Sequence, residues 1–107
     1  DDRVAAAKIY TPEVTKGDVD VEYLKSACKD ALHVCMVLSY AQGLHLLKVA
    51  SSEYNYGVDI ADVVRIWKGG CIIRSAMLND LRKAYLDYPS LNNVVESPVF
   101  KDLFLQI

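Results

Sequence analysis

Apolar side chains recur at three- and four-residue steps through residues 21–53, a stretch that contains no proline. That spacing is the period of an α-helix and not of a β-strand. Asp18 or Asp20 can cap the start of this helix with a side-chain carboxylate. Charged residues occupy one face near the start and are then absent from residues 31–47. Because a helix that is apolar all round is buried on all sides, we expect a long central helix that begins amphipathic and then passes through a larger assembly.

Two shorter helices are predicted on either side of a pair of glycines, Gly69 and Gly70. Asp59 can cap the first of them, and Asp62 is well placed in its first turn. Its apolar stripe is formed by Ile60, Val63, Val64 and Trp67. After the glycines the stripe continues through Ile72, Ile73, Met77, Leu78, Leu81 and Tyr85. We therefore expect the second helix to resume directly after the glycine pair.

The remaining segments also carry helix signals. Residues 1–10 are mostly good helix formers, and Pro12 breaks the chain after them. Pro89 stops the preceding helix, and Ser97 followed by Pro98 is a favourable start for another. Strand-like alternation, internal repeats and low-complexity tracts are absent from the sequence. The predicted fold class is all-α: a long buried central helix packed with shorter helices, with residues 1–107 forming a piece of a larger helical domain.

The presence of two adjacent glycines requires an explanation, because each glycine in a helix interior destabilises the helix by about 1 kcal/mol relative to alanine. A phosphate-binding loop would need a preceding strand, which the sequence does not offer. The structural alternatives are a bend between two helices or a close approach of another helix. We expect a bend or broken helix, with Gly69 and Gly70 serving helix geometry and close packing. On that interpretation, Gly70→Leu harms folding or assembly, whereas normal stability with a selective rise in KM would contradict it.

Three basic residues flank the glycines, namely Arg65, Lys68 and Arg74. An arginine beside a helix break can hold a phosphate group. The simpler interpretation is that Arg74 pairs with a carboxylate on a neighbouring helix while Arg65 and Lys68 remain solvated. We favour the simpler interpretation, and the sequence does not assign a role to Arg74.

Composition is that of an ordinary soluble domain, with 107 residues and a net charge of −2. No basic block is present that would bind a nucleic acid by charge. The uncharged run at residues 31–47 raises the question of a membrane span. Polar side chains interrupt that run, so a buried helix in a soluble core explains it better than a span of about 20 mostly apolar residues; they are His33, Ser39, Tyr40, Gln42 and His45. We expect no membrane and no nucleic acid among the partners.

Side chains that could carry chemistry do not form a recognisable site. His33 and His45 are too far apart along one helix for metal-site spacing. Tyr40, Gln42 and His45 are candidates for a polar seam, lining either an active site or a subunit interface. The cysteines are Cys28, Cys35 and Cys71, an odd number that fits a reducing compartment. A disulfide between the first two is excluded by their spacing along one helix, so small buried apolar groups are the expected role. No base is visible beside Ser39 or the cysteines, so a nucleophile is not assigned.

Three motifs in the second half of the sequence point to a family. They are S-Y-A-Q-G at residues 39–43, N-Y-G at 55–57, and I-W-K-G-G-C-I-I-R-S at 66–75. Their order and spacing resemble the all-helical C-terminal domain of 6-phosphogluconate dehydrogenases, and the opening residues 1–10 also resemble that domain. The third motif is long and unusual, so the resemblance is specific.

The resemblance implies an NADP-dependent oxidoreductase of the pentose phosphate pathway. Such an enzyme oxidatively decarboxylates 6-phosphogluconate, a sugar-acid phosphate, to ribulose 5-phosphate and CO₂. It also implies a cytoplasmic homodimer in which the helical domain supplies interface and scaffold. Preference for NADP over NAD is not decided by the sequence.

The same resemblance carries no catalytic, substrate, cofactor or metal contact onto residues 1–107, and the sequence has no GxGxxG fingerprint. The dinucleotide-binding Rossmann domain of the family is expected outside this chain. We therefore expect a fragment that is inactive alone. A free-standing helical interaction module without enzymatic activity is the alternative interpretation, and the apolar surround of the long helix disfavours it.

Overall fold

The computed structural model describes Val4 and residues 17–105. Its order of elements is α2 (Val21–Glu53), α3 (Ile60–Lys68), α4 (Leu78–Asp87), the 3₁₀ turn η1 (Val94–Glu96) and α5 (Pro98–Leu105). No strand occurs among these described residues, so the all-α prediction is confirmed. The helix predicted within residues 1–10 lies outside the described part of the chain apart from Val4.

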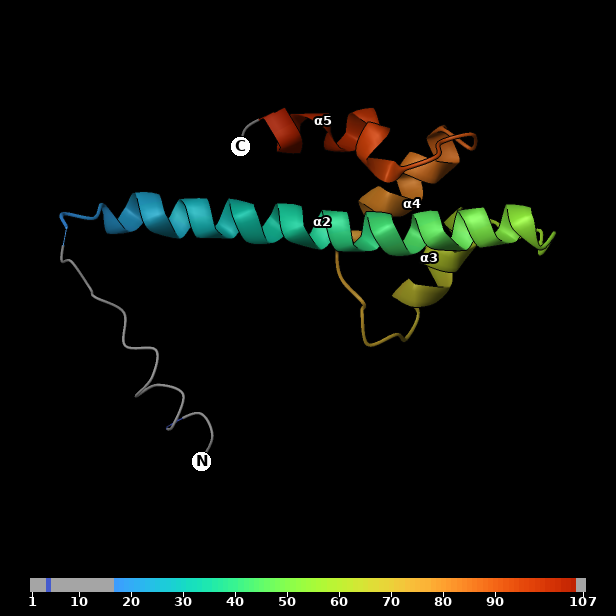
Figure 1. Ribbon diagram of the computed structural model, residues 1–107, viewed down its shortest axis with the longest axis horizontal. Helices are drawn as coiled ribbons and strands as arrows, with labels where there is room; N and C mark the ends of the chain where they lie inside the picture. The colour runs from blue at the N-terminus through green and yellow to red at the C-terminus, as the bar shows by residue number, and fades with distance from the viewer. Residues whose placement is uncertain (1–3, 5–16, 106–107) are drawn as a thin grey trace.

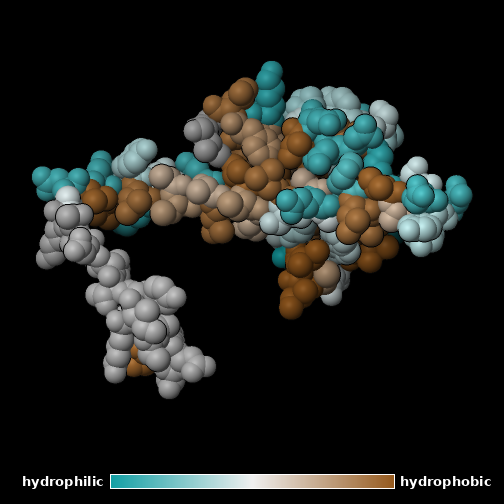
Figure 2. Space-filling view, viewed as in Figure 1, coloured by the Kyte–Doolittle hydropathy of each residue, from teal (hydrophilic) through white to brown (hydrophobic). Residues whose placement is uncertain are grey.

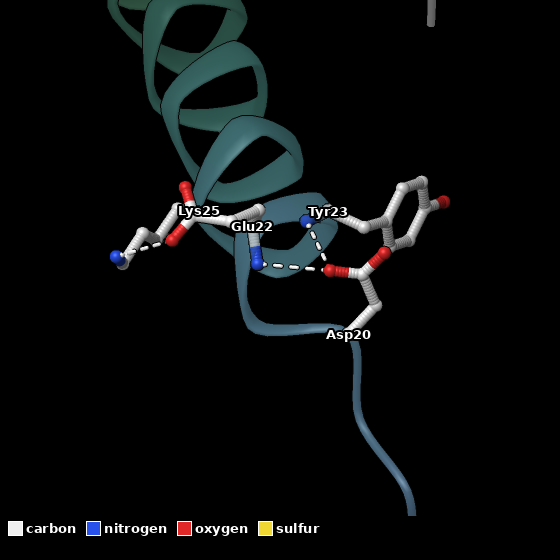
Figure 3. A network of polar contacts seen from close by, with 4 residues as sticks. All are labelled: Asp20, Glu22, Tyr23 and Lys25. Carbon is white, nitrogen blue, oxygen red and sulfur yellow. Dashed lines mark hydrogen bonds and ion pairs between the residues drawn. The ribbon is translucent and has the colours of Figure 1, made fainter.

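The long helix α2 begins where a carboxylate satisfies its first free amides. Asp20, and not Asp18, is the cap: its Oδ1 accepts hydrogen bonds from the backbone N–H groups of Glu22 at 3.0 Å and Tyr23 at 3.1 Å. Figure 3 shows this cap together with the ion pair between Lys25 and Glu22, whose charged atoms are 2.7 Å apart. Both features favour the first turn, as an acid near a helix N-terminus does generally.

The shorter elements gather around the middle and the C-terminal half of α2 (Figure 1). α3 and α4 pack closely on each other, and η1 contacts α2, α4 and α5. The core they enclose is formed by buried side chains from every element, namely Val37, Ala41, Leu44, Ile60, Ala61, Val64, Met77, Leu78, Leu81, Ala84, Tyr85, Val94 and Phe100.

Burial of α2 was predicted for a larger assembly, and within this chain it is confined to one face. Only Val37, Ala41 and Leu44 of its residues are buried, and nearly all of its N-terminal half is exposed. The physical reason is that the other described elements cover one face of one half of the helix. Within this chain α2 is therefore a rod with a single buried face, not a helix buried on all sides.

The glycine pair does end a helix, as predicted. α3 stops at Lys68, and the backbone N–H of Gly69 donates to the carbonyl oxygen of Ile66 at 2.9 Å. A Cβ added at Gly69 would lie 3.3 Å from that same oxygen, whereas one added at Gly70 would meet nothing within 4 Å. Close packing at Gly70 is thus not seen among the described residues, which removes the steric reason to expect harm from Gly70→Leu within this chain.

The helix after the glycines starts later than predicted. α4 begins at Leu78, and the residues before it form successive turns. Within these turns, the carbonyl oxygen of Ile73 accepts a hydrogen bond from the side chain of Tyr40. Ile72 and Ile73 consequently do not continue the buried stripe: Ile72 is fully exposed.

Helix ends elsewhere follow the sequence closely. Asp59 caps α3, accepting from the amides of Ala61 at 2.8 Å and Asp62 at 3.4 Å. Ser97 is buried and its Oγ accepts from the amide of Val99 at 3.2 Å at the start of α5. α4 ends at Asp87, shortly before Pro89. These residues were sufficient to predict where the helices begin and end, because a cap and a proline act within one turn of the helix.

The cysteines do not behave as predicted. Cys28 and Cys35 are exposed on α2, and Cys71 is half-buried. All three are free thiols. The prediction of small buried groups was wrong for Cys28 and Cys35 within this chain, because Cys28 lies in the exposed N-terminal half of α2 and Cys35 lies beside an open hollow between α2 and the loop at residues 70–75.

One described helix, α2, is long and apolar enough to cross a membrane by length and composition, with a mean hydropathy of 1.2 in its most apolar window. A core helix of a soluble protein satisfies the same criterion. α2 supplies three residues to the core of the chain, and 17% of this window is buried within the chain. The expectation that the chain has no membrane contact remains a prediction.

Candidate functional site

Two of the three sequence motifs meet at an open apolar hollow between α2 and the loop at residues 70–75. The hollow has a volume of about 560 Å³. In Figure 2 the loop forms an apolar protrusion below α2. Residues 39–43 form part of the floor, and residues 66–75 form the opposing wall; the lining residues are Leu32, Cys35, Met36, Ser39, Tyr40, Gly43, Trp67, Ile72, Ile73, Arg74 and Ser75.

Tyr40 fastens the loop to α2. Its hydroxyl donates to the carbonyl oxygen of Ile73 and shares a hydrogen bond with the Ser75 hydroxyl, the two oxygens being 3.1 Å apart. Because a hydrogen bond to a partly buried group is worth about 1 kcal/mol net, Tyr40 contributes measurably to the position of the loop. The two motifs are therefore linked by a side chain of one and a backbone group of the other.

Charge at the hollow comes from a single residue, Arg74. Its side chain is exposed, and no carboxylate of the described residues lies within ion-pairing distance of it. The predicted pairing of Arg74 with a neighbouring helix is therefore not seen in the described part of the chain. Arg65 pairs with Asp62 three residues before it at 2.9 Å and remains solvent-exposed, as its spacing and charge predicted, and Lys68 is exposed as well.

The predicted polar seam on α2 divides into separate contacts. The His45 Nδ1 lies 3.0 Å from the carbonyl oxygen of Asn92, and the Lys48 ammonium donates to the carbonyl oxygen of Leu91. Gln42 is exposed. Tyr40 holds a different loop, so these side chains anchor two connections of the fold and do not line one shared site. His33, the other histidine, is exposed on the N-terminal half of α2.

The third motif, residues 55–57, lies at the turn that follows α2. Asn55 has φ 55° and Gly57 has φ 66°, the left-handed region that favours these two residue types. The backbone N–H of Val58 then donates to the Ser51 hydroxyl at 2.8 Å. The motif is therefore explained by chain reversal and carries no reactive group.

The buried polar groups lie in the core, away from the hollow. Tyr85 is 4% exposed, and its hydroxyl has no hydrogen-bond partner among the described residues; the same holds for the Arg82 Nε. Burial, with a smaller contribution from the charge of Glu96, raises the pKa of Tyr85. On the surface of α4, a hydrogen bond with Asp87 raises the pKa of Lys83. Neither residue faces a reactive neighbour.

These groups together do not constitute catalytic machinery. No cluster of three or more metal-ligating side chains occurs in the described residues. The hollow offers three hydroxyl groups, one thiol and one guanidinium, but its lining includes no carboxylate or imidazole that could act as a general base. What the arrangement can do is bind an apolar surface and orient it through one charge.

The sequence did not reveal two of the contacts that hold the loops. Lys48 is the one lysine within residues 31–53, and its contact depends on a loop more than 40 positions away in the sequence. Asn93 caps η1 by accepting from the amide of Val95 at 3.1 Å. Its signal was an asparagine just before a short apolar run, a pattern that also fits an ordinary turn.

Comparison with known proteins resolves the family. The family model for the 6-phosphogluconate dehydrogenase C-terminal domain matches residues 1–106. The chain belongs to this family. Its three motifs and its helices are therefore those of the 6-phosphogluconate dehydrogenase C-terminal domain. The predicted resemblance is confirmed.

Relatives of the domain are full-length enzymes. The chain is 42% identical over 107 residues to a decarboxylating 6-phosphogluconate dehydrogenase of Synechocystis, with 98% of the chain and 22% of the relative covered. It is 40% identical over 105 residues to the Synechococcus elongatus enzyme, covering 97% and 22%. The chain spans about a fifth of the length of these relatives.

A solved structure agrees with this assignment. The 6-phosphogluconate dehydrogenase of Plasmodium falciparum superposes with a TM-score of 0.85 at 30% identity, covering 97% of the chain and 23% of that structure. That protein was solved in its apo form, with its cofactor NADP⁺ and with its substrate 6-phosphogluconate. The helical arrangement described above is therefore that of the 6-phosphogluconate dehydrogenase C-terminal domain.

Proposed function

We propose that this chain is part of an NADP-dependent 6-phosphogluconate dehydrogenase that oxidises and decarboxylates its substrate to ribulose 5-phosphate and CO₂. The observation that carries the proposal is the match of residues 1–106 to the C-terminal domain of that family. Relatives named as the decarboxylating enzyme support it, as does a structural neighbour that binds NADP⁺ and 6-phosphogluconate.

Within that enzyme the chain acts as scaffold. Its described residues contain no pairing of a nucleophile with a base and no metal cluster, so they supply position and not proton transfer. The hydride of the substrate passes to NADP⁺, and the carboxyl group leaves as CO₂, on groups carried by other parts of the enzyme. By itself the chain forms no NADPH.

The assembly proposed for the enzyme is a cytoplasmic homodimer to which residues 1–107 contribute interface as well as support. The exposed apolar residues of α2 are consistent with a role between larger parts; they include Leu24, Leu32, Leu46 and Val49. Three free cysteines are consistent with a reducing compartment. Light scattering of the complete enzyme tests the dimer, and a mass at the monomer value would overturn it.

The activity test compares the complete enzyme containing this chain with the chain alone. With 6-phosphogluconate and NADP⁺, the complete enzyme is expected to form NADPH and release CO₂ in equal amounts, and the chain alone to form neither. A parallel assay with NAD⁺ measures the cofactor preference. NADPH formation without CO₂ would contradict the decarboxylating assignment.

The alternative proposal is a free-standing helical interaction module. It would require the chain to be stable and monomeric with most of α2 exposed. Purified chain that unfolds cooperatively and remains soluble and monomeric at high concentration would favour this alternative. Self-association through the exposed apolar side chains would favour a scaffold that is normally covered.

A further inference from the structure

Two tyrosines meet at the turn that follows α2, at the opposite end of the helix from its start (Figure 1). The rings of Tyr54 and Tyr56 are stacked, with their centroids 5.5 Å apart and their planes inclined by 28°. The two residues are 64% and 66% exposed, respectively. The turn therefore presents two phenol rings to solvent in contact with each other.

The backbone of the turn explains why the two rings can meet. In an α-helix, side chains two positions apart point roughly 200° away from each other, because each residue turns the helix by roughly 100°. Asn55 lies between the two tyrosines and has φ 55°, a left-handed conformation that ends the helical path. The backbone N–H of Tyr56 then donates to the carbonyl oxygen of Ser51 at 3.0 Å. The stack is thus part of a hydrogen-bonded turn.

Other tyrosines of the chain do not combine exposure with a neighbouring ring. Tyr85 is buried, and the hydroxyl of Tyr40 donates to the carbonyl oxygen of Ile73. Tyr23 is 72% exposed but stacks on no aromatic ring of the described residues. Exposure matters for oxidation, because a phenol that loses an electron must also release its proton, and water at the surface accepts it.

We propose that Tyr54 and Tyr56 form a modification site, at which a peroxidase using hydrogen peroxide joins the two rings as dityrosine. Each phenol gives one electron to the oxidant and one proton to water. The two radicals then pair their electrons in a new carbon–carbon bond between ring positions next to the hydroxyl groups. The hydrogen on each of these carbons moves to oxygen and restores the phenol. One hydrogen peroxide takes up the two electrons and two protons and becomes two water molecules.

The stacked arrangement favours coupling within the pair. Because the second ring is already in contact with the first, the reaction does not depend on a chance encounter between two radicals. The product closes a covalent ring across Asn55 and fixes the turn between α2 and α3. This inference goes beyond the proposed function and does not depend on it, since neither tyrosine lines the hollow.

Peptide mapping of the complete protein tests the proposal. The folded protein is treated with a haem peroxidase and limiting hydrogen peroxide, and is then unfolded and digested with trypsin. Cleavage after Lys48 and Arg65 releases residues 49–65, in which Tyr54 and Tyr56 are the only tyrosines. We expect this peptide to lose the mass of two hydrogen atoms, to show dityrosine fluorescence and to resist fragmentation between the two tyrosines. Absence of this product would overturn the proposal.

Three substitutions show whether the geometry of the pair is responsible. Tyr54→Phe keeps the ring and removes the phenol, so it should abolish the product. Asn55→Gly permits the left-handed turn and should leave the yield close to that of the wild type. Asn55→Val carries a branched side chain that disfavours a positive φ, and should lower the yield at least about threefold.

Three further outcomes would contradict the proposal. A product that persists in Tyr54→Phe would mean that the loss of two hydrogen atoms has another origin. A yield in Asn55→Val, or in urea-unfolded protein, equal to that of the folded wild type would show that stacking has no part in the reaction. Peptides from two molecules joined through Tyr54 or Tyr56, in place of the internal product, would show that the two rings do not couple with each other.

Discussion

The hydroxyl groups of Tyr40 and Ser75 lie 3.1 Å apart although their residues are separated by 35 positions in the sequence. Tyr40 also donates to the backbone carbonyl of Ile73. One side chain of α2 thereby holds the loop that follows Gly70. The motifs at residues 39–43 and 66–75 are joined at this point. Holding the loop in place is therefore one reason for these residues, whatever else they do in the complete enzyme.

The first prediction concerns this link. Tyr40→Phe should destabilise the chain by about 1 kcal/mol, because it removes the hydroxyl that satisfies the Ile73 carbonyl. Urea unfolding followed by circular dichroism measures the change. Tyr54→Phe is the matched control, since Tyr54 is 64% exposed and stacks on Tyr56 through its ring alone. Equal effects of the two substitutions would contradict the proposed role of Tyr40.

The second prediction tests which face of α2 is buried in this chain. Leu44 is fully buried and Leu46 is 67% exposed, although they are two residues apart. Leu44→Ala should cost about 2–5 kcal/mol because it leaves a cavity, whereas Leu46→Ala should change the free energy of unfolding by less than about 0.5 kcal/mol. Chemical denaturation of the two variants distinguishes them. A large effect at Leu46 would mean that the free chain covers this face by self-association.

The third prediction concerns the start of α3. Asp59→Ala should cost about 1 kcal/mol, because the amides of Ala61 and Asp62 lose their acceptor. Asp62→Ala removes an exposed ion pair with Arg65 and an acid from the first turn, and should cost a few tenths of a kcal/mol, less than the loss of the cap. Asp59→Asn should restore most of the loss. Thermal unfolding provides the measurement, and no recovery with asparagine would argue against capping.

The fourth prediction concerns the buried hydroxyl of Tyr85. Because this hydroxyl lacks a partner among the described residues, Tyr85→Phe should be neutral or stabilising by up to about 1 kcal/mol at neutral pH. The expected measurement is the midpoint of denaturant unfolding. A loss of more than about 1 kcal/mol would show that the hydroxyl is hydrogen-bonded in solution.

The same residue predicts an alkaline transition. Burial raises the folded pKa of Tyr85, so its neutral form is favoured in the folded state. Its contribution is complete below the ordinary tyrosine pKa of about 10 and is lost as the pH rises through the folded value. The stability difference between wild type and Tyr85→Phe should therefore stay constant below about pH 10 and change through the range above it. A difference that is constant across this range would contradict the assignment.

The sequence predicted the local features of the fold well. The caps at Asp20, Asp59 and Ser97 were expected from single residues and their neighbours, because the hydrogen bonds involved close within one turn. The end of α3 at the glycines followed from the cost of glycine in a helix. The family was recognised from three short motifs because their order and spacing are specific.

What the sequence did not predict depends on distant contacts. α4 starts at Leu78, and the loop before it is bound to α2 through the Tyr40 hydroxyl and the carbonyl of Ile73, an interaction between residues 33 positions apart. Periodicity alone placed Ile72 in a helix, yet that residue is fully exposed in a loop. The exposure of Cys28 and Cys35 likewise depends on which parts of α2 other elements cover, and helical periodicity carries no information about that.

The uneven support of α2 has a consequence for proteolysis. Lys25 and Lys29 lie in its exposed N-terminal half, whereas Lys48 is held through its ammonium group to the carbonyl oxygen of Leu91. A helical stretch without tertiary contacts unwinds readily, because a short helix is only marginally stable in water. Limited trypsin digestion of the chain should therefore cut after Lys25 and Lys29 faster than after Lys48.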